Sequence, residues 1–365
     1  MGISETGAAT MAVSNPDRHN QGKELDYLCV DSFIKNIIDA RVLQTAFELQ
    51  IIDALIENQS CNFDDLKKES GGDSRGLRFL LDLLMTNQVL EEYRGEITLS
   101  QQFTNALKYR DLLEAKLEFA GLVLPDFTDL FTTLVQSPER FARNARIFEL
   151  FGYHRCFDYT PENFEQTKRW MRITTTFTKY EAQVCLRRHD FGPYQHILDV
   201  GGNSGEFVLQ ICREYPTLSA TVFDLPLVCD IGREHIHSEP EADRIAFIKG
   251  DALRDPLPRG FDLIALKSIL HDWPEKEAGL LIANAAKSLD PGGTLLIFER
   301  GPFAMGNTPL PYSMIPFLLF FNSFRSPITY EERLEDLNFL DIKKEKIDLE
   351  TPFYLITAKK PLDQP

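Results

Sequence analysis

The sequence has no excess of basic residues and no long apolar run, and these two absences exclude whole classes of function. Lys and Arg number 39 against 55 Asp and Glu, so the 365-residue chain carries a formal net charge of −16 at pH 7. A charge of this sign opposes binding to nucleic acid or to an anionic membrane. The longest apolar run, 314–321, contains Pro316 and is far shorter than the roughly 20 residues of a spanning helix. We therefore expect no nucleic-acid partner and no membrane segment.

The cysteines also lack the close spacing of a metal site or a redox-active pair. Six are present without any C-x-x-C, so they predict neither a zinc site nor a redox pair, and we expect reduced thiols in a cytoplasmic protein. Residues 1–24 are polar and lack the apolar stretch of a secretory signal, so we expect a flexible tail. His235 and His237 form an H-x-H without a third ligand in view, which indicates a solvated helix end and no metal site.

The N-terminal half has the pattern of packed helices. Residues 31–180 repeat apolar residues at helical spacing, and 62–100 predict a short helix, a glycine turn, a longer helix and two short strands around Arg94-Gly95. This order is typical of a winged helix, and a DNA-binding regulator is therefore an alternative. The expected recognition helix is largely apolar and includes Asp82, which argues against that role. We interpret the apolar excess as a homodimer surface, formed by residues 31–55 and 112–131.

The C-terminal half alternates short apolar strands with helices. Strands are expected at 196–201, 219–224, 245–250, 261–268 and 293–299, which predicts a parallel sheet covered on both faces. The segments 339–347 and 352–360 are joined by a short polar connection and should pair antiparallel. A seven-stranded Rossmann-like α/β sheet whose last strand is antiparallel is the architecture of class I methyltransferases. The predicted division is a tail (1–24), a helical winged-helix dimerisation and substrate-lid domain (25–185) and a catalytic domain (186–365).

A glycine-rich turn follows the first of these strands. The stretch "DVGGNSGEF", 199–207, predicts a nucleotide-type ligand at the carboxyl end of the strand, but it lacks the G-x-G-x-x-G spacing of a dinucleotide site. Asp199 precedes the glycines, and Asp224 and Asp251 end the next two strands. Carboxylates at successive strand ends suit S-adenosylmethionine, which carries an ammonium and a sulfonium but no phosphate.

The stretch "SILHDWPEKEAG", 268–279, places His271, Asp272 and Trp273 side by side before a helix. A single histidine is more often a satisfied polar residue than a base. Taken with "LDVGGNSG", "VFDLP", "GDAL", "LDPGGTLLIFE" and "ITYEERLEDLNF", however, it resembles the S-adenosylmethionine-dependent O-methyltransferases of the caffeate, acetylserotonin and hydroxyneurosporene type. The resemblance covers most of the chain.

The resemblance implies a set of site residues. His271 is similar to the family's general base, and Glu299 matches one of the two glutamates that flank it in many relatives. The implied cofactor-binding residues are Asp199, Gly201, Gly202, Gly205, Asp224, Leu225, Asp251, Ala252 and Lys267. The implied pocket residues for the methyl acceptor are Asp272, Trp273, Met314, Phe317, Phe321 and Asn322.

The chain departs from the family pattern at two places. The second glutamate falls on Pro327, with Glu331 and Glu332 nearby in a predicted helix. Asn203 stands where relatives usually carry glycine, and asparagine tolerates left-handed backbone better than most residues.

The expected activity is methyl transfer to an acidic hydroxyl of a small, largely apolar metabolite. A histidine near pKa 6.5 lies about 3.5 units below a phenol near 10, a gap of roughly 4.8 kcal/mol that a positioned base can reduce. Transfer to carbon or nitrogen, and a relative that binds the cofactor without transfer, remain alternatives. The sequence does not identify the acceptor.

Overall fold

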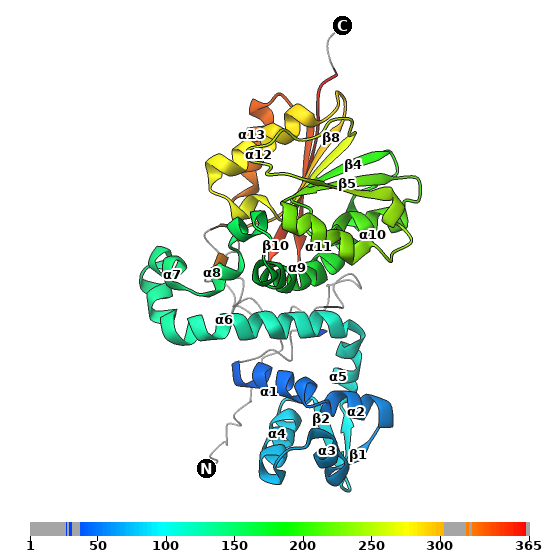
Figure 1. The fold of residues 1–365 in the computed structure, drawn as a ribbon, viewed down its shortest axis with the longest axis vertical. Helices are drawn as coiled ribbons and strands as arrows, with labels where there is room; N and C mark the ends of the chain where they lie inside the picture. The colour runs from blue at the N-terminus through cyan, green and yellow to red at the C-terminus, as the bar shows by residue number, and fades with distance from the viewer. Residues whose placement is uncertain (1–26, 28, 31–36, 303–318, 321–322, 363–365) are drawn as a thin grey trace, which may run out of the picture.

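The computed structural model describes residues 27, 29–30, 37–302, 319–320 and 323–362. It consists of a helical N-terminal part and a C-terminal part built on one large sheet, with two long helices between them (Figure 1).

The N-terminal part begins with a winged helix. Its elements are α1 (Ile37–Glu48), α2 (Ile51–Asn58), β1 (Cys61–Asn62), α3 (Phe63–Ser70), α4 (Ser74–Thr86), β2 (Leu90–Tyr93) and β3 (Glu96–Leu99), with the strands in the order β1-β3-β2. The Asn62 side chain accepts the Asp65 N–H at 2.9 Å and so caps α3. Arg94 and Gly95 form the turn between β2 and β3, both at positive φ. The predicted order of two helices followed by two strands is confirmed.

Two long helices connect the winged helix to the large sheet. The elements of this region are α5 (Gln101–Ala106), η3 (Leu107–Tyr109), α6 (Arg110–Gln136), α7 (Pro138–Asn144), α8 (Ile147–Leu150), η4 (Tyr153–Phe157) and α9 (Pro161–Arg188). Helix α9 packs against α6 on one side and against α10 and α11 of the C-terminal part on the other. It also runs across the predicted domain boundary at 185–186, and that division stays a prediction.

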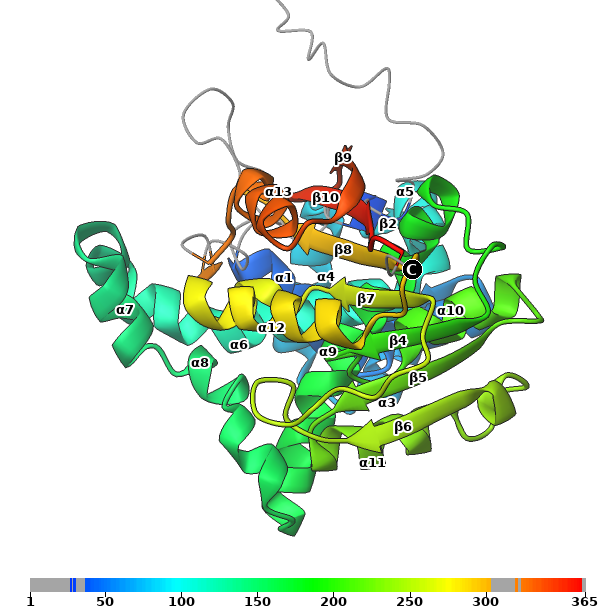
Figure 2. The same cartoon turned by 90° about the horizontal axis from the view of Figure 1, so that it is seen from above.

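The C-terminal part is the predicted doubly covered sheet. Its strands are β4 (His196–Val200), β5 (Ser219–Asp224), β6 (Ile245–Lys249), β7 (Leu263–Lys267), β8 (Thr294–Arg300), β9 (Leu340–Asp348) and β10 (Pro352–Lys359). They lie in the order β6-β5-β4-β7-β8-β10-β9, and β10 runs antiparallel to both of its neighbours (Figure 2). The class I methyltransferase architecture, including the final antiparallel strand, is confirmed.

Side chains alternate between the two faces of this sheet, as buried strands require. On β7, Leu263 and Ala265 join the core that contains α9 and α10 residues, whereas Ile264 and Leu266 join the core under α12 and α13. The helices of this part are α10 (Glu206–Glu214), α11 (Pro226–Ile236), η5 (Ala242–Arg244), η6 (Leu270–Asp272), α12 (Glu275–Ser288) and α13 (Pro327–Asp336).

The strand order reverses at β4, which lies between β5 and β7. Ligands of open α/β sheets bind at the carboxyl ends of the strands beside such a reversal. Among the residues described, no helix is long and apolar enough to cross a membrane.

Candidate active site

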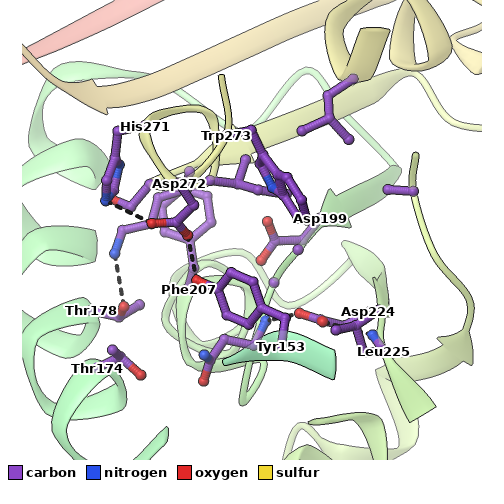
Figure 3. A pocket seen from close by; sticks show the side chains of 18 of the residues that line it. Tyr153, Thr174, Thr178, Asp199, Phe207, Asp224, Leu225, His271, Asp272 and Trp273 are labelled. Carbon is purple, nitrogen blue, oxygen red and sulfur yellow. Dashed lines mark hydrogen bonds and ion pairs between the residues drawn. The ribbon is translucent and has the colours of Figure 1, made fainter. Parts of the chain in front are cut away.

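A cavity opens at the carboxyl edge of the sheet, beside the reversal at β4. It encloses about 1200 Å³ of space not filled by protein, part of it open to solvent. The glycine turn after β4, the ends of β5 and β7, the η6 turn and one side of α9 all contribute to its wall. Figure 3 shows Asp224 and Leu225 at one end of this space and His271 at the other.

The glycine turn needs its glycines for space as well as for backbone conformation. Gly201 lies at φ 69°, and a Cβ there would come within 2.3 Å of the Ile269 side chain. A Cβ on Gly202 would lie 2.5 Å from the Asp199 carboxylate. Asn203 is at φ 55°, the left-handed conformation expected for it, and its side chain accepts the Ser204 N–H at 2.8 Å.

Three acids line the cavity at the ends of successive strands, as the sequence predicted. Asp199 is only 1% exposed, and both of its carboxylate oxygens lack a hydrogen bond among the described residues. Burial raises the pKa of Asp199 to about 7 against the opposing charge of Lys267. Asp224 accepts the N–H groups of Asn203 at 2.8 Å and Leu225 at 2.7 Å. Burial raises the pKa of Asp224 to about 6.

The third acid, Asp251, has more partners than Asp199. It accepts the Leu253 N–H at 3.0 Å, and its other oxygen lies 3.4 Å from Nε of Arg254. Ala252 and Lys267 line the same cavity. Of the three acids, Asp199 is the one whose carboxylate oxygens have no hydrogen-bond partner among the described residues, which suits a cationic ligand.

His271 lies in η6 and is paired with Glu299 of β8. Its Nδ1 is 2.6 Å from Oε1 of Glu299, whose side chain is 1% exposed. The other oxygen of Glu299 accepts the backbone N–H of Leu270 at 2.9 Å. Burial lowers the pKa of His271, but the charges of Glu299 and Asp272 and the hydrogen bond that the imidazole donates to Glu299 outweigh it, so the pKa is raised. The same contact with His271 opposes the effect of burial on Glu299, whose pKa is lowered.

Besides Glu299 and Asp272, the His271 ring contacts an aromatic side chain, and not Pro327, at which the alignment placed a second glutamate. Phe324 packs edge-on against the imidazole with ring centroids 5.4 Å apart. Pro327 is instead the first residue of α13, after a Ser326 cap. Glu331 forms an ion pair with Lys344, and Glu332 lines a separate cleft between α12 and α13. None of these three occupies the position expected for a second glutamate.

Arg325 binds backbone carbonyls of the η6 turn that carries His271. Its guanidinium donates to the backbone carbonyl of Leu270 at 2.7 Å and also to that of Trp273. Glu299 binds the N–H groups of the turn and Arg325 binds its carbonyls. Phe324 ends the phenylalanine-rich stretch 314–324 that the sequence offered as a wall of the acceptor pocket. Its contact with His271 and the role of Arg325 were not expected, because both residues lie in an irregular segment whose path the local pattern does not predict.

Asp272 and Trp273 face a wall of aromatic residues. Asp272 accepts the Tyr153 hydroxyl at 2.7 Å, and its Oδ1 lies 3.3 Å from Nε2 of His271. The Tyr153 ring packs against Trp170 and Trp273. The other aromatic residues of the cavity wall are Phe151, Phe157, Phe177 and Phe207. Met314, Phe317, Phe321 and Asn322, the other expected pocket residues, lie outside the described residues.

Helix α9 contributes polar residues that sequence reasoning missed. Thr175 donates to Ser204 of the glycine turn at 2.7 Å, and Lys267 donates to Thr178 at 2.8 Å. Glu181 forms ion pairs with Lys267 and Arg300. These residues sit in the half of the chain that was interpreted as a dimerisation region, and no local pattern in α9 indicates that they reach the cavity.

His235 and His237 lie away from this cavity. Nε2 of His235 is 2.7 Å from Glu206, and Nδ1 of His237 is 3.1 Å from the Glu234 carbonyl of its own helix. Among the described side chains, no three His, Cys, Asp or Glu residues gather in a way that could hold a metal ion.

Comparisons with known families match two segments of the chain. Residues 133–326 match the model of the O-methyltransferase domain, and residues 32–106 match that of the O-methyltransferase dimerisation domain. The first match covers more than half of the chain.

Individual relatives match at lower coverage. A 3-hydroxy-5-methyl-1-naphthoate 3-O-methyltransferase of Streptomyces sahachiroi is 39% identical over 139 residues, or 38% of this chain and 39% of that protein. A probable bifunctional dTTP/UTP pyrophosphatase/methyltransferase protein of Homo sapiens is 26% identical over 81% of this chain. The matched region spans 48% of the human protein, so in both cases the chain covers less than half of the relative's length.

Among solved structures, human N-acetylserotonin methyltransferase in complex with SAM has a similar fold. The TM-score is 0.71 at 21% identity, covering 94% of this chain and 99% of that one.

Proposed function

Because the chain belongs to the O-methyltransferase family, we propose that it transfers a methyl group from S-adenosylmethionine to an acidic hydroxyl of a small, largely apolar metabolite. The observation that carries this proposal is that His271, which lines the same cavity as Asp199, Asp224 and Asp251, is paired with the buried Glu299. A base and a cluster of strand-end acids thus share one space.

The residues of the cavity suit the proposed cofactor. The buried carboxylate of Asp199, which lacks a hydrogen-bond partner, fits a ligand that carries positive charge. In this proposal Asp224 and Leu225 hold the ribose, Asp251 and Ala252 lie by the adenine, and Lys267 lies near the methionine end. Gly201, Gly202 and Gly205 keep the turn open for close approach. When bound, the cofactor supplies an electrophilic methyl group on a sulfonium.

The chain's own part in the reaction is to align the acceptor and take its proton. Glu299 accepts a hydrogen bond from Nδ1–H of His271, which selects the tautomer with a lone pair on Nε2. Nε2, which lies 3.3 Å from Oδ1 of Asp272, can then accept the proton of the acceptor hydroxyl, and the charges of Glu299 and Asp272 stabilise the imidazolium that forms. The raised pKa of His271 narrows the gap to a phenol or enol, so an acidic hydroxyl is the best match.

The aromatic wall favours a flat acceptor. Tyr153, Trp170 and Trp273 pack against one another, and Phe157 lies half exposed at the mouth of the cavity. Flat aromatic faces of this kind bury planar ring systems well.

We further propose that the protein is a homodimer in the cytoplasm. The matched dimerisation domain and the exposed side chains of Ile38, Phe79 and Phe131 support self-association. Buried free thiols at Cys61, Cys156, Cys185, Cys212 and Cys229 fit a reducing compartment. Light scattering at micromolar concentration should give twice the mass of one chain, and a monomer would contradict the proposal.

The function is tested by incubating the protein with methyl-labelled S-adenosylmethionine and a panel of phenols, enols, aromatic amines and keto acids. We expect label on oxygen of a flat phenolic or enolic compound, located by mass spectrometry. Label on carbon or nitrogen would overturn the hydroxyl assignment, and binding of cofactor without any product would overturn transfer itself.

A further inference from the structure

Helix α9 buries a carboxylate between the cations at the ends of two neighbouring strands. Glu181 is 3% exposed, and its Oε2 lies 2.5 Å from Nζ of Lys267, the last residue of β7. Its Oε1 accepts a hydrogen bond from the guanidinium of Arg300, the last residue of β8. All three side chains line the cavity that contains His271.

Arg300 connects this cluster directly to the proposed base. Its backbone N–H donates at 2.8 Å to Oε1 of Glu299, the same oxygen that contacts His271. Its guanidinium donates at 3.1 Å to the hydroxyl of Ser268, which precedes the η6 turn. The backbone of Arg300 therefore supports Glu299, and its side chain supports Ser268, which leads into the turn that carries His271.

The cluster also sets the charge that faces the imidazole. Glu299 and Asp272 present negative charge to His271, and Arg300 presents positive charge. The carboxylate of Glu181 acts on the imidazole from α9. The Tyr153 hydroxyl acts on it only indirectly, by donating a hydrogen bond to Asp272. Without Glu181, the buried cations Lys267 and Arg300 would lose the negative charge that they share. Their uncompensated positive charge would destabilise a protonated His271 and so lower its pKa.

We propose that Glu181 is a positioning residue for His271: it neutralises Lys267 and Arg300 and holds the Arg300 guanidinium where it donates to Ser268, ahead of the turn that carries His271. The proposal rests on the proposed function of His271 as a base. It also means that the helix between the two halves of the chain forms part of the catalytic apparatus. Glu181 itself touches neither the base nor the acceptor in this scheme.

Removing the charge of Glu181 and removing the charge of Arg300 should shift the pH dependence of the reaction in opposite directions. Glu181→Gln keeps the size of the side chain but removes its negative charge, so the acid limb of the kcat/KM profile should move to lower pH by about one unit. Arg300→Gln should move it to higher pH, and the double variant should lie between the two. Because Arg300 is less well held in Glu181→Gln, kcat should also fall about 10- to 100-fold with KM little changed.

A matched control is available at another glutamate that forms an ion pair with a lysine, this time near the surface. Glu234→Gln breaks the half-exposed ion pair between α11 and Lys168 of α9, whose charged atoms lie 3.2 Å apart. It should leave both the pH profile and kcat unchanged. A purely structural role for Glu181 would lower stability in Glu181→Gln without moving the acid limb, and that result would overturn the proposal.

Titration of the His271 imidazole by NMR, without any acceptor, separates this inference from the function. The signal is assigned among the seven histidines by its loss in His271→Ala. A lower His271 pKa in Glu181→Gln supports the coupling even if the wild type methylates nothing in the panel, in which case only the function fails. An unchanged titration in an active enzyme overturns the inference. If Glu181→Gln does not fold, Arg300→Gln is decisive through the opposite shift.

Discussion

His271 and Glu299 come from neighbouring segments of the sheet edge, and Nδ1 of the imidazole lies 2.6 Å from Oε1 of the carboxylate. The second oxygen of Glu299 accepts the N–H of Leu270 at 2.9 Å. One side chain therefore fixes both the ring and the backbone turn that carries it. This arrangement leads to predictions that separate base strength, cofactor binding and fold stability.

Removal of the imidazole should abolish proton transfer and leave the cofactor site intact. In His271→Ala the transfer rate should fall about 10²- to 10⁴-fold, because a general base contributes in this range. Affinity for S-adenosylhomocysteine, measured by calorimetry, should change by less than about threefold, since Asp199, Asp224 and Asp251 are untouched. Unchanged turnover would mean that His271 is only a polar residue at the end of a strand.

The pH dependence of the wild type follows from the raised pKa of His271. Proton acceptance needs the neutral ring, so kcat/KM should fall on the acid side with a midpoint above the ordinary value of about 6.5. Glu299→Gln removes a negative charge that raises this pKa, so the midpoint should move to lower pH while the plateau rate drops. A midpoint that stays in place in Glu299→Gln would show that His271 does not control the acid limb.

A carboxylate at the apolar flank of the ring should have the opposite effect. Phe324→Glu places negative charge beside His271, so the acid limb should move to higher pH than in the wild type. Phe324→Gln is the matched control, because it changes shape and polarity without adding charge. If both variants move the limb equally, the effect is one of packing and Phe324 does not tune the base.

The buried carboxylate of Asp199 should lower the stability of the protein without cofactor and raise its affinity for S-adenosylmethionine. The pKa of Asp199 is about 7 in the folded protein and near 3.9 in the unfolded chain. The contribution of Asp199 to the free energy of unfolding is therefore fully present below about pH 3.9 and is lost as pH rises through 7. Asp199→Asn should therefore be more stable than wild type at pH 8 by a few kcal/mol, at roughly 1.4 kcal/mol per pKa unit.

The same Asp199→Asn variant should bind S-adenosylmethionine at least about tenfold more weakly, since it loses the charge that faces a cationic ligand. Urea denaturation and calorimetry measure the two effects separately. The control is Asp230→Asn, which removes a surface carboxylate 2.7 Å from Lys249 and should change neither quantity appreciably. Asp199→Asn with reduced stability at pH 8 would contradict the prediction.

The glycine turn permits a test by a single methyl group. Gly202→Ala would place a Cβ 2.5 Å from the Asp199 carboxylate, so cofactor affinity should fall about tenfold or more and stability by about 1–3 kcal/mol. Gly76→Ala in α4 meets no atom within 4 Å and should be neutral or slightly stabilising. Equal effects of the two variants on binding would show that Gly202 is not constrained by the site.

The sequence predicted the parts of the fold and site that depend on local patterns. The strands from β4 to β10 were recognisable from short apolar runs, and Asp199, Asp224 and Asp251 from their positions where those runs end. Asn203 was expected to adopt a left-handed conformation and does so. Glu299 was located through the resemblance, which matched the end of "LLIFE" to a glutamate of the family, and it lies within β8.

The residues that were missed depend on how distant segments meet in space. Glu181 and Thr178 reach the cavity because α9 crosses behind the sheet edge, and nothing in their own helical pattern indicates this. The resemblance placed the second glutamate at Pro327. That residue begins α13, and the ring of His271 contacts Phe324, which lies three residues earlier in the irregular segment. Contacts of irregular segments follow from tertiary packing, which periodicity does not encode.

The two sides of the cavity come from different segments of the chain, so they can be exchanged separately. Tyr153 and Trp170 of the aromatic wall come from the segment before the sheet, whereas His271, Glu299 and the strand-end acids come from the sheet edge. A chimera that takes residues 150–173 from a relative would therefore inherit a new acceptor preference and keep its own transfer chemistry. The exchange has to stop before Thr175, Thr178 and Glu181, because from there onward the same helix holds the glycine turn and the strand ends together.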